Sequence, residues 1–165
     1  MIHNGVELQG MTHNGVEVQT WIHNGVQAYN SFTPFYVVKS GSLVDGNYVS
    51  AKRVKSGTVF GDENRNYGLY VYANENNATA GYDITFNTNK AEKLTFNARA
   101  VYGNHRFYIY GDGKVIYTIP SHEDRAVSGT IDISNYSEIR IYGYAQSYYA
   151  GMQLEAYITE IYCHK

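Results

Sequence analysis

Tyrosines are the residues of this chain whose number and spacing could do chemistry, since there are 18 of them against one tryptophan and six phenylalanines. A tyrosine ring has a flat apolar face that packs on the C–H surface of a sugar, and its hydroxyl binds polar groups. Amide, carboxylate and guanidinium groups nearby would bind the sugar hydroxyls. Three stretches combine these groups: NRNYGLYVYANENN (64–77), VYGNHRFYIY (101–110) and YGYAQSYYAG (142–151). The composition therefore predicts a surface that binds a glycan.

Eight residues of these stretches are the candidate glycan-binding residues: Tyr67, Tyr70, Tyr72, Asn104, His105, Arg106, Tyr148 and Tyr149. Tyr70 and Tyr72 lie two residues apart, so a β-strand would place both rings on one face. Tyr148 and Tyr149 stand in a loop-like segment where packing gives the least reason for aromatic residues. We expect their replacement by alanine to abolish glycan retention without unfolding the protein. The alternative for any single tyrosine is a core or sheet-surface role, which this residue type also fills.

The sequence contains no motif of a common hydrolytic or phosphoryl-transfer site, since GxSxG, HExxH and phosphate-binding loops are all absent. Glycoside hydrolysis needs two carboxylates that converge on one bond, whereas the acidic residues here are scattered singly. We therefore expect a protein that is not an enzyme. The alternative is a small glycan hydrolase, which requires two carboxylates within about 5–10 Å at the base of a cleft.

Metal sites have two sequence features in their favour, and neither is compelling on chemical grounds. His3, His13 and His23 recur at the same point of a repeat. Successive turns of a β-meander lie at opposite ends, so His13 would be roughly 20 Å from the other two, and we expect no zinc site. The loop GDENRNYG has enough oxygen ligands for calcium or for a sugar contact, and its candidates are Asp62, Glu63, Asn64 and Asn66. We expect no other cofactor.

Charge and hydropathy exclude two classes of partner. The formal net charge is −2, with 13 basic and 15 acidic residues and no run of either sign. Bulk electrostatic attraction to nucleic acid or to an anionic membrane is therefore not expected. No basic segment is followed by an apolar one at the N-terminus, and no run reaches about 18 apolar residues, so we expect neither secretion nor insertion. The single cysteine, Cys163, lies in a strand-like run that predicts a packed structural thiol.

The first 30 residues contain His-Asn-Gly-Val three times at intervals of ten residues. Asn-Gly is the preferred pair for a two-residue type I′ hairpin turn, so Asn4-Gly5, Asn14-Gly15 and Asn24-Gly25 predict a β-meander with one aliphatic face. A sheet this small needs a partner to cover that face. We expect the same segment of other chains to cover it, giving a homo-oligomer with a trimer favoured. The alternative is that the sheet packs on its own domain.

The tandem units THNGVEVQTWIHNGV resemble short repeats of tail, fibre and other virion-associated proteins from phages and prophages of Gram-positive bacteria. The resemblance covers residues 2–30. It implies a place in the virion and contacts with other virion proteins.

The remainder of the chain predicts an all-β fold. Residues 31–35 form a proline-containing linker, and from residue 36 to 165 short strand-like runs alternate with turn clusters while helical spacing is nearly absent. This pattern is typical of a β-sandwich. Asp112-Gly113 predicts a two-residue hairpin, whose flanking strands can place four residues on one face: Phe107, Ile109, Val115 and Tyr117.

The order GDGKVIYTIP, a polar stretch, GTIDISNYSEIRIYGYA and a closing apolar strand resembles the carbohydrate-binding jelly-rolls first described at the N-termini of glycosidases. It implies a jelly-roll head with a short turn at Asn135 and Tyr136 between two core strands. The whole chain is then a non-catalytic phage-type protein whose head binds a bacterial surface or environmental glycan. The alternative is a purely structural fibre or decoration protein, whose tyrosines contact neighbouring subunits and bind no sugar.

Overall fold

A computed structural model describes residues 11–13, 16–23, 26–56, 59–60, 67–73 and 76–165. The three predicted Asn-Gly turns lie outside the described residues, and so does the segment 61–66 that contains the candidate calcium ligands.

The N-terminal part is an antiparallel meander, as the repeats predict. It consists of β1 (Met11–His13), β2 (Val16–His23) and β3 (Val26–Phe32), which pair in that order. The pairs His13 with Val16 and His23 with Val26 close two hairpins with two residues between the strands. The connection to the next part is shorter than the predicted linker 31–35, because β3 continues to Phe32 and β4 begins at Phe35.

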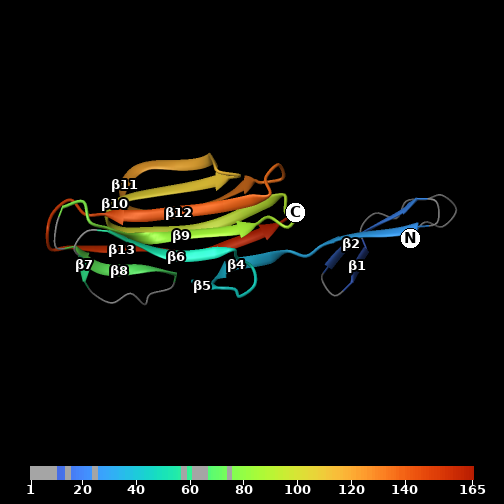
Figure 1. Ribbon diagram of the computed structural model, residues 1–165, viewed down its shortest axis with the longest axis horizontal. Helices are drawn as coiled ribbons and strands as arrows, with labels where there is room; N and C mark the ends of the chain where they lie inside the picture. The colour runs from blue at the N-terminus through green and yellow to red at the C-terminus, as the bar shows by residue number, and fades with distance from the viewer. Residues whose placement is uncertain (1–10, 14–15, 24–25, 57–58, 61–66, 74–75) are drawn as a thin grey trace.

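The body of the chain is an all-β sandwich, and its described residues contain no helix (Figure 1). Strands alternate buried and exposed residues, as the burial of β12 and β13 shows, because each strand turns one face to the interior. Its strands are β4 (Phe35–Lys39), β5 (Ser42–Leu43), β6 (Ser50–Ser56), β7 (Val59–Phe60), β8 (Tyr67–Ala73), β9 (Thr79–Asn87), β10 (Lys93–Gly111), β11 (Lys114–Asp132), β12 (Glu138–Gln146) and β13 (Met152–His164). The predicted fold class is confirmed.

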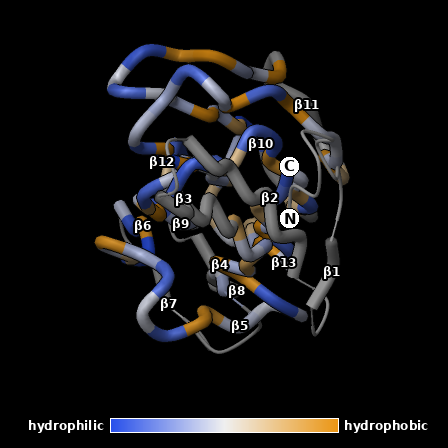
Figure 2. Tube along the Cα trace, turned by 90° about the vertical axis from the view of Figure 1, so that its right-hand side faces the viewer, coloured by the Kyte–Doolittle hydropathy of each residue, from blue (hydrophilic) through white to orange (hydrophobic). Residues whose placement is uncertain are grey.

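A long hairpin joins the two layers. Strands β10 and β11 are each 19 residues long and pair along their length. On its other edge, β10 pairs first with β13 (93–101) and then with β12 (104–111). One layer therefore continues through β12, β9 and β6, and the other through β13, which pairs with both β4 and β8. Figure 2 shows β6, β9 and β12 on one side and β4, β8 and β13 on the other.

The predicted Asp112-Gly113 hairpin is confirmed, since both residues have positive φ (46° and 79°) as a type I′ turn requires. The prediction that Phe107, Ile109, Val115 and Tyr117 share one face is not confirmed. Val115 is 52% exposed, whereas Tyr117 packs on the core, because the β10–β11 register shifts between Ile109 and Tyr110. β10 runs without a break through residues 102–105, although this segment contains glycine and asparagine.

Aromatic and aliphatic side chains fill the space between the layers. The ring centroids of Phe96 and Phe107 are 5.3 Å apart and the rings are stacked, with Tyr117 against both. Cys163 is buried in this core, as predicted, and burial raises the pKa of its thiol to about 12. The thiol is therefore protonated and inert at neutral pH.

Gly143 leaves space for the fully buried ring of Tyr82. Tyr82 on β9 is fully buried, and its ring lies over Gly143 of the neighbouring strand β12. A Cβ atom at position 143 would lie 2.5 Å from the Tyr82 hydroxyl oxygen and 2.6 Å from the adjacent ring carbon. Glycine at this position is therefore a packing requirement.

Candidate functional site

Four tyrosines form one aromatic surface on the outside of the β10–β12 layer. We call this surface the tyrosine face, and it consists of Tyr108, Tyr110, Tyr142 and Tyr144. Phe107 and Ile109 are fully buried between the layers. Because side chains alternate along a strand, the intervening tyrosines of β10 point outward.

The tyrosines of β12 lie beside those of β10. Tyr108 pairs directly with Tyr142, and their ring centroids are 6.4 Å apart. Tyr108 lies 6.2 Å from Tyr110, and Tyr142 lies 5.4 Å from Tyr144. Burial raises the pKa of the Tyr142 and Tyr144 hydroxyls, so both remain protonated and able to donate hydrogen bonds at neutral pH. The result is a continuous aromatic surface with polar groups along it.

An ion-pair network fixes one end of the tyrosine face. Arg140 donates hydrogen bonds from Nε and Nη2 to the two carboxylate oxygens of Asp83, at 2.7 and 2.9 Å, and Lys52 lies 3.4 Å from the same carboxylate. The Arg140 guanidinium also lies 5.3 Å from the ring centroids of Tyr110 and Tyr142. Such bidentate and cation–π contacts hold the rings in one arrangement before a ligand arrives.

The charge of Asp83 is set by these partners. Burial acts to raise the pKa of its carboxyl, but the hydrogen bonds and positive charges of Arg140 and Lys52 outweigh burial and lower the pKa. Asp83 is 5% exposed, so its carboxylate is ionised in a largely dry position and depends on its partners.

We expect the Asp83→Asn variant to be about 1–2 kcal/mol less stable than the wild type at neutral pH. The folded-state pKa of Asp83 lies below its unfolded value of about 3.9, so the stabilisation is complete above that pH and is lost as the pH falls through the folded-state pKa. Urea unfolding of both proteins between neutral pH and about pH 2 measures the difference, which should shrink in acid. A difference that stays constant over this range would contradict the role of the ionised carboxylate.

Two predicted residues form the other end of the tyrosine face. Arg106 pairs with Tyr144 and Asn104 with Gln146 across β10 and β12. The pKa of Arg106 is raised, first by its side-chain hydrogen bond to Tyr108 and then by Tyr144 nearby. Nε of Arg106 and Oδ1 of Asn104 are buried and have no hydrogen-bond partner in the described part of the chain. The guanidinium and the amide therefore have hydrogen-bonding capacity that the described residues do not use.

Other predicted residues lie elsewhere. His105 is fully buried, so its ring lies on the inner side of β10, away from the tyrosine face. Tyr67 packs against the core from β8, and its pKa is raised to about 12, chiefly by burial. Tyr70 and Tyr72 belong to β8 and pair in the backbone with β13, and their side chains lie outside the described part of the structure.

Tyr148 and Tyr149 lie in the turn between β12 and β13 and are 45% and 59% exposed. The backbone N–H of Tyr148 contacts the Met152 sulfur at 3.4 Å. Both tyrosines follow the β12 strand that bears Tyr142 and Tyr144. They therefore remain candidates for contacting a ligand that extends beyond the end of the tyrosine face.

The rings at the centre of the tyrosine face were missed among the sequence candidates. The glycan-binding candidates in the stretches 101–110 and 142–151 are polar residues and loop tyrosines, and they do not include these strand tyrosines. The signal was the alternation in FYIYG (107–111) and EIRIYGYA (138–145), where aliphatic or phenyl residues alternate with tyrosine and arginine.

A second aromatic row lies on the outside of the other layer. The ring centroids of Tyr36 and Tyr162 are 4.5 Å apart, and those of Tyr162 and His164 are 5.2 Å apart. His164 Nε2 and Thr95 Oγ1 are hydrogen bonded at 3.0 Å, and Thr95 also bonds Thr130 at 2.8 Å. His164 and Thr95 in this row are therefore committed to hydrogen bonds within the protein.

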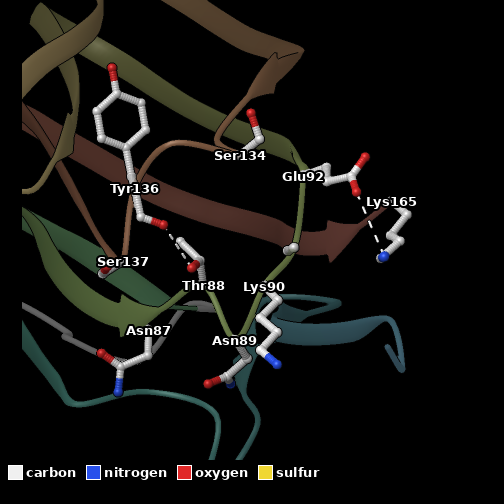
Figure 3. Close-up of a pocket in the computed structure, with 10 residues that line it drawn as sticks. Asn87, Thr88, Asn89, Lys90, Glu92, Ser134, Tyr136, Ser137 and Lys165 are labelled. Carbon is white, nitrogen blue, oxygen red and sulfur yellow. Dashed lines mark hydrogen bonds and ion pairs between the residues drawn. The ribbon is translucent and has the colours of Figure 1, made fainter. Parts of the chain in front are cut away.

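One end of the sandwich has an open pocket of about 670 Å³ (Figure 3). It lies where the β9–β10 turn meets the β11–β12 turn, and Thr88 donates a hydrogen bond to the Tyr136 carbonyl at 2.8 Å between them. Glu92 and Lys165 form an ion pair at 3.7 Å at its edge. Its lining is Asn87, Thr88, Asn89, Lys90, Ala91, Glu92, Ser134, Tyr136, Ser137 and Lys165.

The described residues contain neither a group of metal ligands nor a membrane-spanning helix. In the part of the chain that the structure describes, no three His, Cys, Asp or Glu side chains are grouped as metal ligands. The same part has no helix with the length and hydropathy to cross a membrane.

The chain matches no protein-family model and no curated protein. Among solved structures it is similar to the CBM51-2 and INT domains of ZmpB from Clostridium perfringens, with a TM-score of 0.50 and 11% identity. The match covers 90% of this chain and 37% of that one, so this chain spans well under half of the ZmpB structure.

Two further solved structures have lower scores. The enzymatically active domain of tailspike protein 4 from bacteriophage CBA120 has a TM-score of 0.49 and 14% identity, over 77% of this chain and 21% of that one. A CBM51 from Clostridium perfringens GH95 in complex with methyl-galactose has a TM-score of 0.43 and 11% identity, over 79% and 99%. At these identities the ZmpB match establishes the sandwich fold alone.

Proposed function

We propose that the sandwich is a non-catalytic glycan-binding module and that the glycan lies along the tyrosine face. The observation that carries this proposal is the set of four outward tyrosine rings, flanked by Arg140 with Asp83 at one end and Arg106 with Asn104 at the other. Flat rings receive sugar C–H faces, and the flanking groups bind hydroxyls. The rings are held by neighbours on both strands, so little side-chain entropy is lost on binding.

The chemistry of Asp83 supports binding over hydrolysis. A glycosidase needs one carboxylic acid whose raised pKa keeps it protonated at the start of the reaction. Asp83 is unsuited to the role of that acid because its pKa is lowered, and Arg140 engages both of its oxygens, including the one that a base or nucleophile would use. It is suited to fixing the arginine beside the rings.

We extend the proposal to the whole chain as a phage-type adhesion protein of the virion. The N-terminal repeats would join several chains, a trimer being favoured, and several heads would raise a weak single-site affinity through high effective concentration. The repeat resemblance at residues 2–30 supports this setting. Sedimentation of the chain with and without residues 1–30 measures the role of the repeats, and an unchanged mass would remove it.

Retention of the full chain on immobilised bacterial cell-wall and capsular polysaccharides, with and without calcium, tests the binding function. We expect saturable retention on one or a few glycans, with a dissociation constant that does not depend on calcium. Failure across a broad panel would instead favour a structural fibre or decoration protein, whose aromatic surface contacts neighbouring subunits.

A further inference from the structure

We propose that the pocket at the end of the sandwich is a second ligand site, which takes a small hydroxylated acid such as a hexuronic acid. The pocket is built from turns and does not include any residue of the tyrosine face. Its volume of about 670 Å³ lies within the roughly 300–1,000 Å³ typical of small-molecule sites. The inference therefore stands independently of the function proposed above.

The turn at the pocket contains a lysine in a backbone conformation that favours glycine. Asn89 and Lys90 have φ values of 51° and 70°, and the Ala91 N–H donates to the Thr88 carbonyl at 2.9 Å, which defines a type I′ turn. Asparagine suits the first central position, whereas glycine is strongly preferred at the second. A lysine at this position lowers the stability of the fold, and residues with such backbone strain cluster at functional sites.

Lys90 forms no ion pair within the described part of the chain. Among the described residues no carboxylate lies within ion-pair distance of its ammonium group. The neighbouring lysines differ, because Lys165 pairs with Glu92 at 3.7 Å and Lys93 pairs with Asp132 at 2.9 Å. In Figure 3, the Lys90 side chain extends from the turn and its ammonium group lies beside Asn89, apart from the Glu92–Lys165 ion pair. An anionic group is the complementary ligand.

The remaining lining suits hydroxyl groups. Thr88 and Ser134 already donate hydrogen bonds to Tyr136 and Asp132. The polar uncharged side chains that line the pocket without such a commitment in the described structure are two amides and two hydroxyls, those of Asn87, Asn89, Tyr136 and Ser137. Amides both donate to and accept from sugar hydroxyls. The combination of one cation with these groups selects a ligand that has both a negative charge and hydroxyls.

Isothermal titration of the full chain with matched small molecules tests the site. We expect saturable binding of galacturonate and at least tenfold weaker binding of galactose, which has a neutral hydroxymethyl group in place of the carboxylate. Inorganic phosphate distinguishes a general oxyanion site from a sugar-acid site. If phosphate binds and galacturonate does not, or if galactose binds as well as galacturonate, the assignment is overturned.

The Lys90→Gly variant separates function from stability. We expect it to lose at least tenfold in galacturonate affinity while its Tm rises by about 1–3 °C, since glycine relieves the positive-φ strain. Lys90→Arg should retain most of the binding, and Lys93→Gln, which removes a nearby paired lysine, should leave binding unchanged. Equal binding by wild type and Lys90→Gly, or no saturable binding of either anion by the wild type, would refute the site. Binding of galacturonate should also survive Tyr142→Ala, so a failed tyrosine face and a failed pocket give different results.

Discussion

We expect the Tyr108→Ala/Tyr142→Ala double variant to lose saturable retention on the glycan that the proposed function assigns to the wild type, a fall of at least about 100-fold in affinity. The two rings are directly paired at the centre of the tyrosine face. Central aromatic contacts of this kind contribute about 2 kcal/mol or more each to binding, and each 1.4 kcal/mol is a factor of ten. Titration calorimetry or retardation in a glycan-containing gel measures the loss.

Two comparisons make that result specific. Tyr36→Ala removes a ring of similar kind from the opposite layer and should leave affinity within about twofold, since a site remote from the ligand changes little. The Tyr148→Ala/Tyr149→Ala variant tests the tyrosines that the sequence favoured, and abolished retention there would move the site to the β12–β13 turn. Normal affinity of the Tyr108→Ala/Tyr142→Ala variant, with unchanged thermal unfolding, would remove the tyrosine face from the function.

The Gly143→Ala variant is expected to lose about 2–3 kcal/mol of stability and to unfold about 5–10 °C lower. The added Cβ atom would meet the Tyr82 hydroxyl at 2.5 Å, and Tyr82 is fully buried, so its ring has no solvent into which to move. Differential scanning calorimetry and urea unfolding measure the change. Gly129→Ala is the matched control, because the nearest atom to the Cβ that it adds is a Phe96 ring carbon at 3.3 Å, which is farther than the 2.5 Å contact at Gly143.

A second substitution identifies the cause. The Tyr82 hydroxyl is buried and, among the described residues, has no hydrogen-bond partner. Tyr82→Phe should therefore be neutral or slightly stabilising, because it removes an unsatisfied polar group. In the Gly143→Ala background it should restore part of the lost stability, giving a coupling of about 0.5–1.5 kcal/mol. Strict additivity of the two changes would show that the clash does not involve the Tyr82 hydroxyl.

Local sequence signals predicted the fold class well, because turns and alternation act over a few residues. The Asp112-Gly113 hairpin and the burial of Cys163 follow from their immediate neighbours. The lengths of the long strands β10 and β11 do not follow from their immediate neighbours. Residues 101–105 contain glycine and asparagine, which are usual strand breakers, but pairing with β11, β12 and β13 carries β10 through them.

The tyrosine face was harder to predict for the same reason. Asn104 and Arg106 are the two sequence candidates that the structure places at its end. Tyr142 beside Tyr108 is a property of register between strands that are distant in sequence. The contact of Arg140 with Asp83 also depends on β12 lying against β9. His105 was selected with its neighbours, but alternation turns it to the interior.

The pairing of β4 with β13 has a consequence for how the protein is made. β4 directly follows the N-terminal sheet, yet its partner is β13, which is synthesised much later than β4. Until then β4 presents an unpaired edge, and unpaired edges are templates for aggregation. Pairing over so long a stretch of chain is also slow. A nascent chain released before β13 is complete would keep that edge open, so the sandwich resists aggregation only once β13 has been synthesised.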